Sequence, residues 1–224
     1  MAHIHFIACV HLDPLGRERV ARALEAEQPD VVTLEKSAED FKFIQTGQID
    51  QSIELCIARL RKRRLDSSDE RVLRDYFKLI DYATVEALKY GKVRGVPIVP
   101  VDDAREAYLQ RYFSHLMHPM PGVHDMMAKN HRICSSFYSM LESFFAYNGP
   151  HFLVGEQERV DRDKEDFCSR DPVSAAMLRE LASVHSGKIV HFCGGAHAMR
   201  DMQKKTLFSL LEDLRPTRSV LSRY

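Results

Sequence analysis

The sequence predicts an α/β fold, in which helices flank a central and mainly parallel β-sheet. Two observations support this prediction. Short runs rich in Val, Ile and Phe recur along the chain, and most are apolar at consecutive positions, which is typical of strands buried on both faces of a parallel sheet. Stretches with the apolar spacing of amphipathic helices separate these runs. We therefore expect a single α/β domain over residues 1–224, with a helical insertion in the middle of the chain.

The composition agrees with one folded domain. Hydrophobic residues make up 45% of the 224 residues, which is enough apolar surface for a sizeable core. The 32 Lys and Arg balance the 32 Asp and Glu, so we expect no binding to nucleic acid or to an anionic membrane, which both require a basic excess. No apolar stretch is long enough for a transmembrane helix, and the N-terminal run is too short and too His-rich for a signal peptide. Five scattered cysteines suit reduced thiols, so the expected location is cytoplasmic.

The chain opens with a predicted strand–helix–strand unit. The first strand is expected at His3–Val10. Asp13 followed by Pro14 predicts the start of a helix, with an N-cap and then proline at the first helical position. Pro29 ends this helix, and the second strand is expected at Asp30–Leu34. A unit of this size matches a right-handed βαβ crossover.

The middle of the chain has helical patterns without a strand signal. They run from about Ile49 to Tyr90, with a break at Ser67–Asp69, and form the expected insertion over residues 49–90. Two uses of this insertion stay open: a lid over a site, or the dimer face of a homodimer. A third strand is expected at Val96–Val101, where two prolines favour a position at the edge of the sheet.

The remaining elements are predicted from the same patterns. Four further helices are expected, at Asp103–Met117, His124–Ala146, Pro172–His185 and Ala198–Leu214. The fourth strand is expected at Lys188–Cys193, and Phe152–Val154 could add a short one. Asp171 and Pro172 repeat the signal of a cap followed by proline.

The carboxyl ends of the predicted strands carry the residues from which we predict a site. In an open parallel sheet, ligands bind beyond these ends. The residues there are His11, Glu35, Asp102 with Asp103, and the run Gly194-Gly195-Ala196-His197. Two histidines and a glutamate suit zinc, manganese or cobalt, with positions left open for water. Such a cation would activate water for hydrolysis, and without a metal a His–Glu pair could act as general base.

Structural roles for the same residues are the competing interpretation. Asp13 and Asp171 are more often helix caps than catalysts, and Asp102 could cap the next helix. Glu35 and Lys36 could form a solvated ion pair. A single histidine at a strand end is usually structural, but the expected convergence of three polar strand ends weakens that alternative.

Several motifs resemble a known family. The segment Ala8–Glu35 resembles the opening of the TraB/PrgY and Tiki proteins, which belong to the erythromycin-esterase/ChaN-like superfamily. That opening has a Gly-x-x-His turn, a helix, and a Pro-Asp-Val-Val strand that ends in glutamate. His11 and Glu35 fall on its polar positions, with Ala8 in place of the glycine. Gly194 and His197 match the second Gly-x-x-His of the family.

Two shorter segments extend the resemblance. Gly95–Asp102 looks like the middle strand of the family. Arg170 and Asp171, followed by Ala176 and Met177, resemble its Arg-Asp-x-x-Met-Ala element with altered spacing. The resemblance implies an α/β fold with a mainly parallel sheet and, for Tiki-type members, metal-dependent peptidase activity that uses the two histidines and the glutamate.

We therefore expect a metal-dependent hydrolase of amide or ester bonds, with a small molecule or a peptide as substrate. The expected metal ligands for Mn, Co or Zn are His11, Glu35 and His197. The expected catalytic residues are Glu35, Arg170, Asp171 and Asp102, of which Arg170 stabilises an oxyanion or a substrate carboxylate and one of the aspartates orients another side chain. The expected substrate contacts are Gly194, Gly195 and Arg170. Two alternatives stay open: a non-catalytic module that binds a small ligand or haem, and a metal-free esterase with a histidine base.

Overall fold

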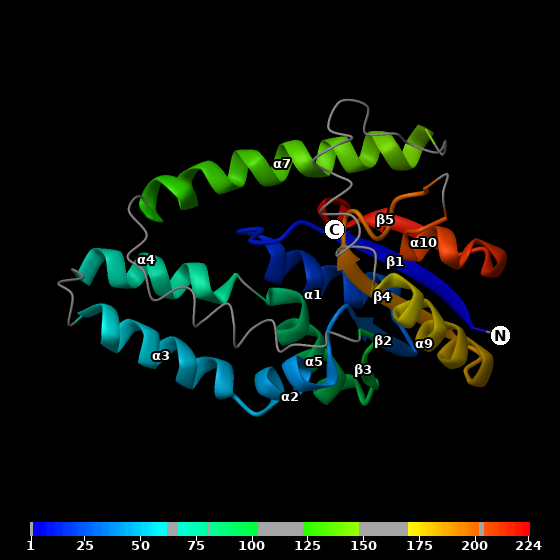
Figure 1. Cartoon of the computed structure of the whole chain (residues 1–224), viewed down its shortest axis with the longest axis horizontal. Coiled ribbons are helices and arrows are strands. Elements are labelled where there is room, and N and C mark those ends of the chain that lie inside the picture. Colours follow the sequence, from blue (N-terminus) through cyan, green and yellow to red (C-terminus); the bar gives the residue numbers. More distant parts are fainter. Residues whose placement is uncertain (1, 62–66, 80, 103–122, 148–169, 202–203) are drawn as a thin grey trace.

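The computed structural model describes residues 2–61, 67–79, 81–102, 123–147, 170–201 and 204–224. Its centre is a five-stranded sheet in the order β3-β2-β4-β1-β5, in which every neighbouring pair is parallel. The strands are β1 (His3–Cys9), β2 (Val31–Leu34), β3 (Ile98–Pro100), β4 (Lys188–Gly194) and β5 (Thr217–Val220). The prediction of an α/β fold with a parallel sheet is confirmed (Figure 1).

Helices surround this sheet (Figure 1). They are α1 (Gly16–Glu27), α2 (Ala38–Gln45), α3 (Gln48–Arg61), α4 (Ser67–Lys78), α5 (Tyr82–Arg94), α7 (Val123–Tyr147), α9 (Asp171–Val184) and α10 (Leu207–Leu210), with short 3₁₀ turns η1 (Glu212–Leu214) and η2 (Leu221–Arg223). The helices α3, α4 and α5 account for the predicted helical insertion. In Figure 1, α3 and α4 extend to one side of the sheet, and α7 runs above them.

The two faces of the sheet are covered by different helices. Phe6 of β1 packs edge-on against Phe208 of α10, with ring centroids 5.6 Å apart. The preceding residue, His5, points to the other face, where it lies near Glu27 at the end of α1. This alternation follows from the pleat of a strand. β1 and β4 are buried along almost their whole length, and most of their side chains are apolar, as the sequence predicts; His5 of β1 and His191 of β4 are buried polar exceptions.

Of the two edge strands of the sheet, one was predicted from the sequence and the other was not. β3 lies at one edge, as its prolines predict. β5 lies at the other edge and has no counterpart among the predicted strands. Its sequence Thr-Arg-Ser-Val is mostly polar, because the first half of this strand is exposed or only partly buried.

Two predicted helices are wrong in extent. The first helix begins at Gly16 instead of Pro14, because the Asp13 carboxylate accepts the Leu15 N–H and so holds a turn before the helix. The long helix predicted at 198–214 is replaced by a loop, α10 and η1. Thr206 caps α10 by accepting the Ser209 N–H, which places the helix start at Leu207, nine residues later than expected.

Three expectations fall on parts of the chain that the structure does not describe. These are the helix at Asp103–Met117, the strand at Phe152–Val154, and the side chain of Asp103. Among the residues that are described, the cysteines Cys9, Cys56, Cys134 and Cys193 are free thiols. None of the described helices combines the length and the apolar character that crossing a membrane requires.

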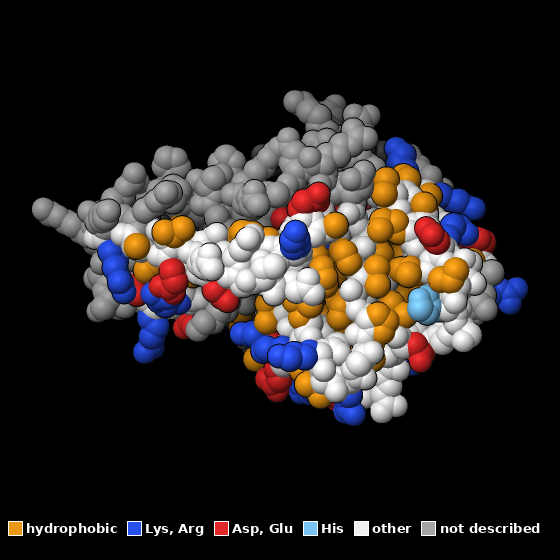
Figure 2. All heavy atoms as spheres, turned by 90° about the horizontal axis from the view of Figure 1, so that it is seen from below, with side chains coloured by type: hydrophobic (Ala, Val, Ile, Leu, Met, Phe, Trp, Pro, Cys, Tyr) orange, Lys and Arg blue, Asp and Glu red, His pale blue; other side chains and the backbone are white. Residues whose placement is uncertain are grey.

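The surface in Figure 2 shows how the charges are distributed on one face. Apolar side chains gather over its middle, and basic and acidic side chains alternate along the margin. The zero net charge is therefore not divided into one basic and one acidic region on this face.

Candidate functional site

Three predicted site residues meet at the carboxyl edge of the sheet, around Gly194. A Cβ atom placed on Gly194 would lie 3.6 Å from His11 Nε2, 3.6 Å from Glu35 Oε2 and 3.5 Å from His197 Cδ2. The missing side chain of Gly194 therefore leaves a space that both histidines and the glutamate border. The three side chains come from the ends of β1, β2 and β4, which are adjacent strands in the sheet.

The Glu35 carboxylate is fixed by two contacts. Its Oε2 accepts the Gly194 N–H at 2.8 Å, and its Oε1 lies 3.1 Å from His197 Nε2. Burial alone would raise the pKa of Glu35, but the His197 ring and the Gly194 N–H lower this pKa by more, to well below its usual range. Glu35 is therefore a carboxylate at neutral pH.

The buried His197 ring lies between two carboxylates. Its Nδ1 is 2.6 Å from Asp171 Oδ1, and its Nε2 faces Glu35. Burial would lower the pKa of His197, but Glu35 and Asp171 outweigh it and raise this pKa to about 10. His197 is therefore an imidazolium at neutral pH, hydrogen-bonded to Asp171 through Nδ1 and paired with the Glu35 carboxylate on its Nε2 side.

Asp171 has a positioning role that the cap interpretation missed. Arg170 occupies the cap position of α9 without a capping hydrogen bond from its side chain, and Asp171 is the first residue of the helix. The Asp171 carboxylate contacts His197 through Oδ1 and accepts the Leu207 N–H through Oδ2 at 2.7 Å. The expectation that Asp171 caps α9 is therefore wrong; its carboxylate instead joins the start of α10 to the His197 ring in the loop after β4.

The turn that carries His11 is held by two distant tyrosines. The Tyr82 hydroxyl of α5 donates to the Val10 carbonyl at 2.8 Å. The Tyr138 hydroxyl of α7 accepts the Val10 N–H at 3.3 Å and donates to the buried carboxylate of Asp13 at 2.9 Å. Leu12 takes a left-handed φ of 62°, which is costly for a leucine and is maintained here by these contacts.

The His11 ring is available for proton transfer or for metal binding. Surrounding protein atoms displace water from it and lower its pKa, an effect that the Glu35 carboxylate opposes. The ring is therefore mostly neutral at pH 7, with a free lone pair on one nitrogen. His11 is also exposed to solvent, whereas His197 is buried.

Arg170 and Asp102 form a second pair beside the cluster. The Arg170 guanidinium contacts Asp102 through one terminal nitrogen and lies 3.5 Å from Glu35 Oε1 through the other. Burial raises the pKa of Asp102, and the guanidinium partly offsets this effect. About a third of the Arg170 side chain is exposed, so it borders the cluster on the solvent side.

Neighbouring contacts bear on two further residues named from the sequence, Glu35 and Gly195. Glu35 does not form a solvated ion pair with Lys36, because the Lys36 ammonium pairs with Asp81 at 3.5 Å. Gly195, an expected substrate contact, lies against α7: a Cβ on Gly195 would be 2.6 Å from Leu141 Cδ1. The absence of a side chain at Gly195 therefore allows α7 to pack on the loop that leads to His197.

The cluster has part of the geometry that a cation requires. Two ligands bound about 2.1 Å from one ion lie roughly 3.0–3.4 Å apart, and the separation of His197 Nε2 from Glu35 Oε1 falls within this range. A carboxylate on the other ring nitrogen, here Asp171, is the usual support of a metal-binding histidine. In the described parts of the chain, however, no group of three or more His, Cys, Asp or Glu is arranged to hold a metal ion as it stands.

Nothing in the sequence indicated the two tyrosines that hold the turn before His11. Tyr82 and Tyr138 are 72 and 128 residues from the backbone that they hold, and no local motif marks them.

No protein-family model, no curated protein and no solved structure matches this chain.

Proposed function

We propose that this protein is a hydrolase of amide or ester bonds that activates a water molecule in the space beside Gly194. The observation that carries the proposal is the meeting of His11, Glu35 and His197 at that space. The similarity of the same segments to TraB/PrgY and Tiki proteins supports a hydrolytic, peptidase-type reaction on a peptide or small molecule.

The charges of the cluster suit such a reaction. The neutral His11 ring can accept a proton from water and return it to the leaving group, which is the role of a general base and acid. The Arg170 guanidinium has N–H groups beyond those that contact Glu35 and Asp102, and these can stabilise a developing oxyanion. Asp171 holds the His197 ring, which in turn holds the Glu35 carboxylate.

The donor set also fits a divalent cation such as Mn²⁺, Co²⁺ or Zn²⁺. His11, Glu35 and His197 would hold it, and a bound cation polarises a carbonyl and lowers the pKa of water. His197 would have to release its Nε2 proton to serve as a ligand, because its raised pKa makes it an imidazolium whose Nε2 pairs with Glu35 in this arrangement. Metal binding here would therefore strengthen as the pH rises.

A metal-free mechanism is the second candidate. It is favoured by the engagement of both His197 nitrogens with carboxylates, and by the neutral His11 ring as base. In that mechanism His197 stays an imidazolium and fixes Glu35, and the reaction needs no cation.

The test is a screen of ester and peptide substrates with protein treated with chelator, before and after addition of each cation. Activity that depends on a cation supports the metal-dependent form, and activity that persists in chelator supports the metal-free form. The double variant His11→Ala/His197→Ala should be inactive in both conditions while it keeps the circular dichroism of the wild type. Hydrolysis at the wild-type rate by this folded double variant would contradict the proposal.

A further inference from the structure

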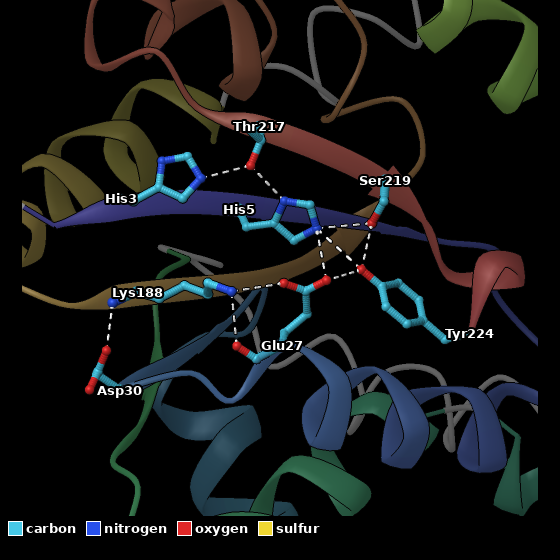
Figure 3. A network of polar contacts seen from close by, with 8 residues as sticks. All are labelled: His3, His5, Glu27, Asp30, Lys188, Thr217, Ser219 and Tyr224. Atoms are coloured by element: carbon cyan, nitrogen blue, oxygen red, sulfur yellow. Dashed lines mark hydrogen bonds and ion pairs between the residues drawn. The ribbon is translucent and has the colours of Figure 1, made fainter.

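A second pair of histidines lies on β1, on the α1 side of the sheet. His3 and His5 are two residues apart on the strand, so their side chains point to the same face. Thr217 of β5 is the register partner of His5 and lies between the two rings (Figure 3). His3 Nε2 is 2.8 Å and His5 Nδ1 is 2.7 Å from Thr217 Oγ1.

The two imidazoles therefore converge on one hydroxyl group. A hydroxyl has a single proton, so it can donate to only one of the two nitrogens that face it. His3 and Thr217 are exposed, and solvent can reach the point where the nitrogens converge.

The other nitrogen of His5 is held by a set of polar groups. Ser219 Oγ is 3.0 Å, Tyr224 Oη is 3.4 Å and Glu27 Oε1 is 3.8 Å from His5 Nε2 (Figure 3). The Tyr224 hydroxyl donates its proton to Glu27, so its oxygen faces His5 Nε2 as an acceptor, and the Glu27 carboxylate attracts the same proton from 3.8 Å. The proton is thus favoured on Nε2, and the lone pair of His5 is on Nδ1, toward Thr217.

We propose that His3 and His5 form a transition-metal site that is separate from the cluster around Gly194. The ligands are His3 Nε2 and His5 Nδ1, with water and, after a small rotation, the Thr217 hydroxyl completing the coordination. A histidine that is supported on its other nitrogen by a carboxylate and hydroxyls is the usual form of a metal ligand. Two imidazole nitrogens without a thiolate favour Cu²⁺, with weaker binding of Ni²⁺ and Zn²⁺.

The charges around this pair are compatible with a cation. The Glu27 carboxylate lies on the Nε2 side of His5. The Lys188 ammonium donates to the carboxylate and the carbonyl of Glu27 at 3.1 and 3.0 Å, so the charge of Lys188 is balanced by Glu27. Burial lowers the pKa of His5, an effect that His3 and Lys188 increase and Glu27 opposes.

The experiment starts from the His11→Ala/His197→Ala protein, in which the cluster around Gly194 has lost both histidines and contributes no imidazole to Cu²⁺ binding. Cu²⁺ binding by this protein therefore tests the His3–His5 site independently of the proposed hydrolase site. Cu²⁺ is titrated calorimetrically into this parent and into the parent with His3→Ala added, at pH 7. We expect His3→Ala to remove one Cu²⁺ site, and the electron paramagnetic resonance spectrum of the parent to show two imidazole nitrogens at it.

The control is the parent with His185→Ala, which removes an imidazole that has no hydrogen bond to either ring of the pair. We expect this control to keep the site. Because His3 is exposed, the His3→Ala protein should keep the circular dichroism and the melting temperature of the parent. Equal Cu²⁺ stoichiometry and affinity in the parent and in the His3→Ala protein would overturn the proposal, as would loss of the site in the His185→Ala control.

Discussion

The variant Gly194→Ala places a methyl group in the space that the proposed reaction requires. The new Cβ would lie 3.5–3.6 Å from His197, Glu35 and His11, which is ordinary van der Waals contact without a clash. The backbone of Gly194 is not in the left-handed region, so alanine is tolerated there. We therefore expect a change in the free energy of unfolding of less than about 1 kcal/mol, and that change can be stabilising.

The same methyl group would occupy the space in which we propose that water or a cation binds. Displacement of a reacting group by about 1 Å can cost roughly 10²-fold in rate, and we expect a loss of at least this size in kcat/KM. Urea denaturation measures the stability, and steady-state hydrolysis of the best substrate from the screen measures the rate.

The neighbouring glycine supplies a matched control. In Gly195→Ala the Cβ would lie 2.6 Å from Leu141 Cδ1, so the leucine must shift, and we expect a loss of about 1–3 kcal/mol in stability. Gly195→Ala leaves the space beside Gly194 open, so its activity should fall much less while the protein is folded. Full activity of Gly194→Ala would contradict the proposed role of this space, as would a lower activity of Gly195→Ala than of Gly194→Ala when both variants are folded.

Three further predictions follow from the contacts around the site. Tyr138→Phe removes a hydroxyl that holds both Val10 and the buried carboxylate of Asp13, so the free energy of unfolding should fall by about 1–3 kcal/mol. The hydrolysis rate should also fall, because the turn that carries His11 loosens. Urea denaturation measures the stability and steady-state kinetics the rate, and an unchanged rate would contradict this role of Tyr138. Asp171→Asn removes a negative charge from the His197 ring, so the pKa of His197 should fall below about 10; a proton NMR titration measures it, and an unchanged pKa would exclude the contact. Burial lowers the pKa of His191 to about 4, whereas the unfolded chain titrates near 6.5, so the unfolded state binds more protons between these values and stability falls as the pH falls. From pH 7 to pH 5 the wild type should lose about 2 kcal/mol more than His191→Gln, and an equal loss in the two proteins would refute the burial of a neutral ring.

The strand pattern was predictable because parallel strands buried on both faces have few polar positions. β1 and β4 are of this kind, and their apolar runs mark them clearly. β5 is the reverse case, since an edge strand with a partly exposed first half can be polar, and Thr217–Val220 has no distinctive pattern. The segment 198–214 has helical spacing, but the cap at Thr206 starts the helix late.

The candidate site could be predicted only in part, for a related reason. Parallel strands bring their carboxyl ends to one edge, so residues that follow strands can be placed together from sequence. The sequence left two roles open for Asp171, a helix cap and a group that orients another side chain, because aspartate before proline also predicts a cap; only the folded chain shows that its carboxylate contacts His197. Tyr82 and Tyr138 lie on helices far along the chain, where nothing in the sequence indicates that they hold the turn before His11.

The most direct test of the central claim is the rate of hydrolysis by Glu35→Gln relative to the wild type. Glutamine keeps the size of the side chain and can still accept the Gly194 N–H, but it removes the charge that pairs with His197 and that would support a cation or the His11 base. We expect the rate to fall by roughly 10²-fold or more while the protein stays folded. A folded Glu35→Gln protein that hydrolyses the substrate as fast as the wild type would contradict the proposal that water is activated between His11, Glu35 and His197.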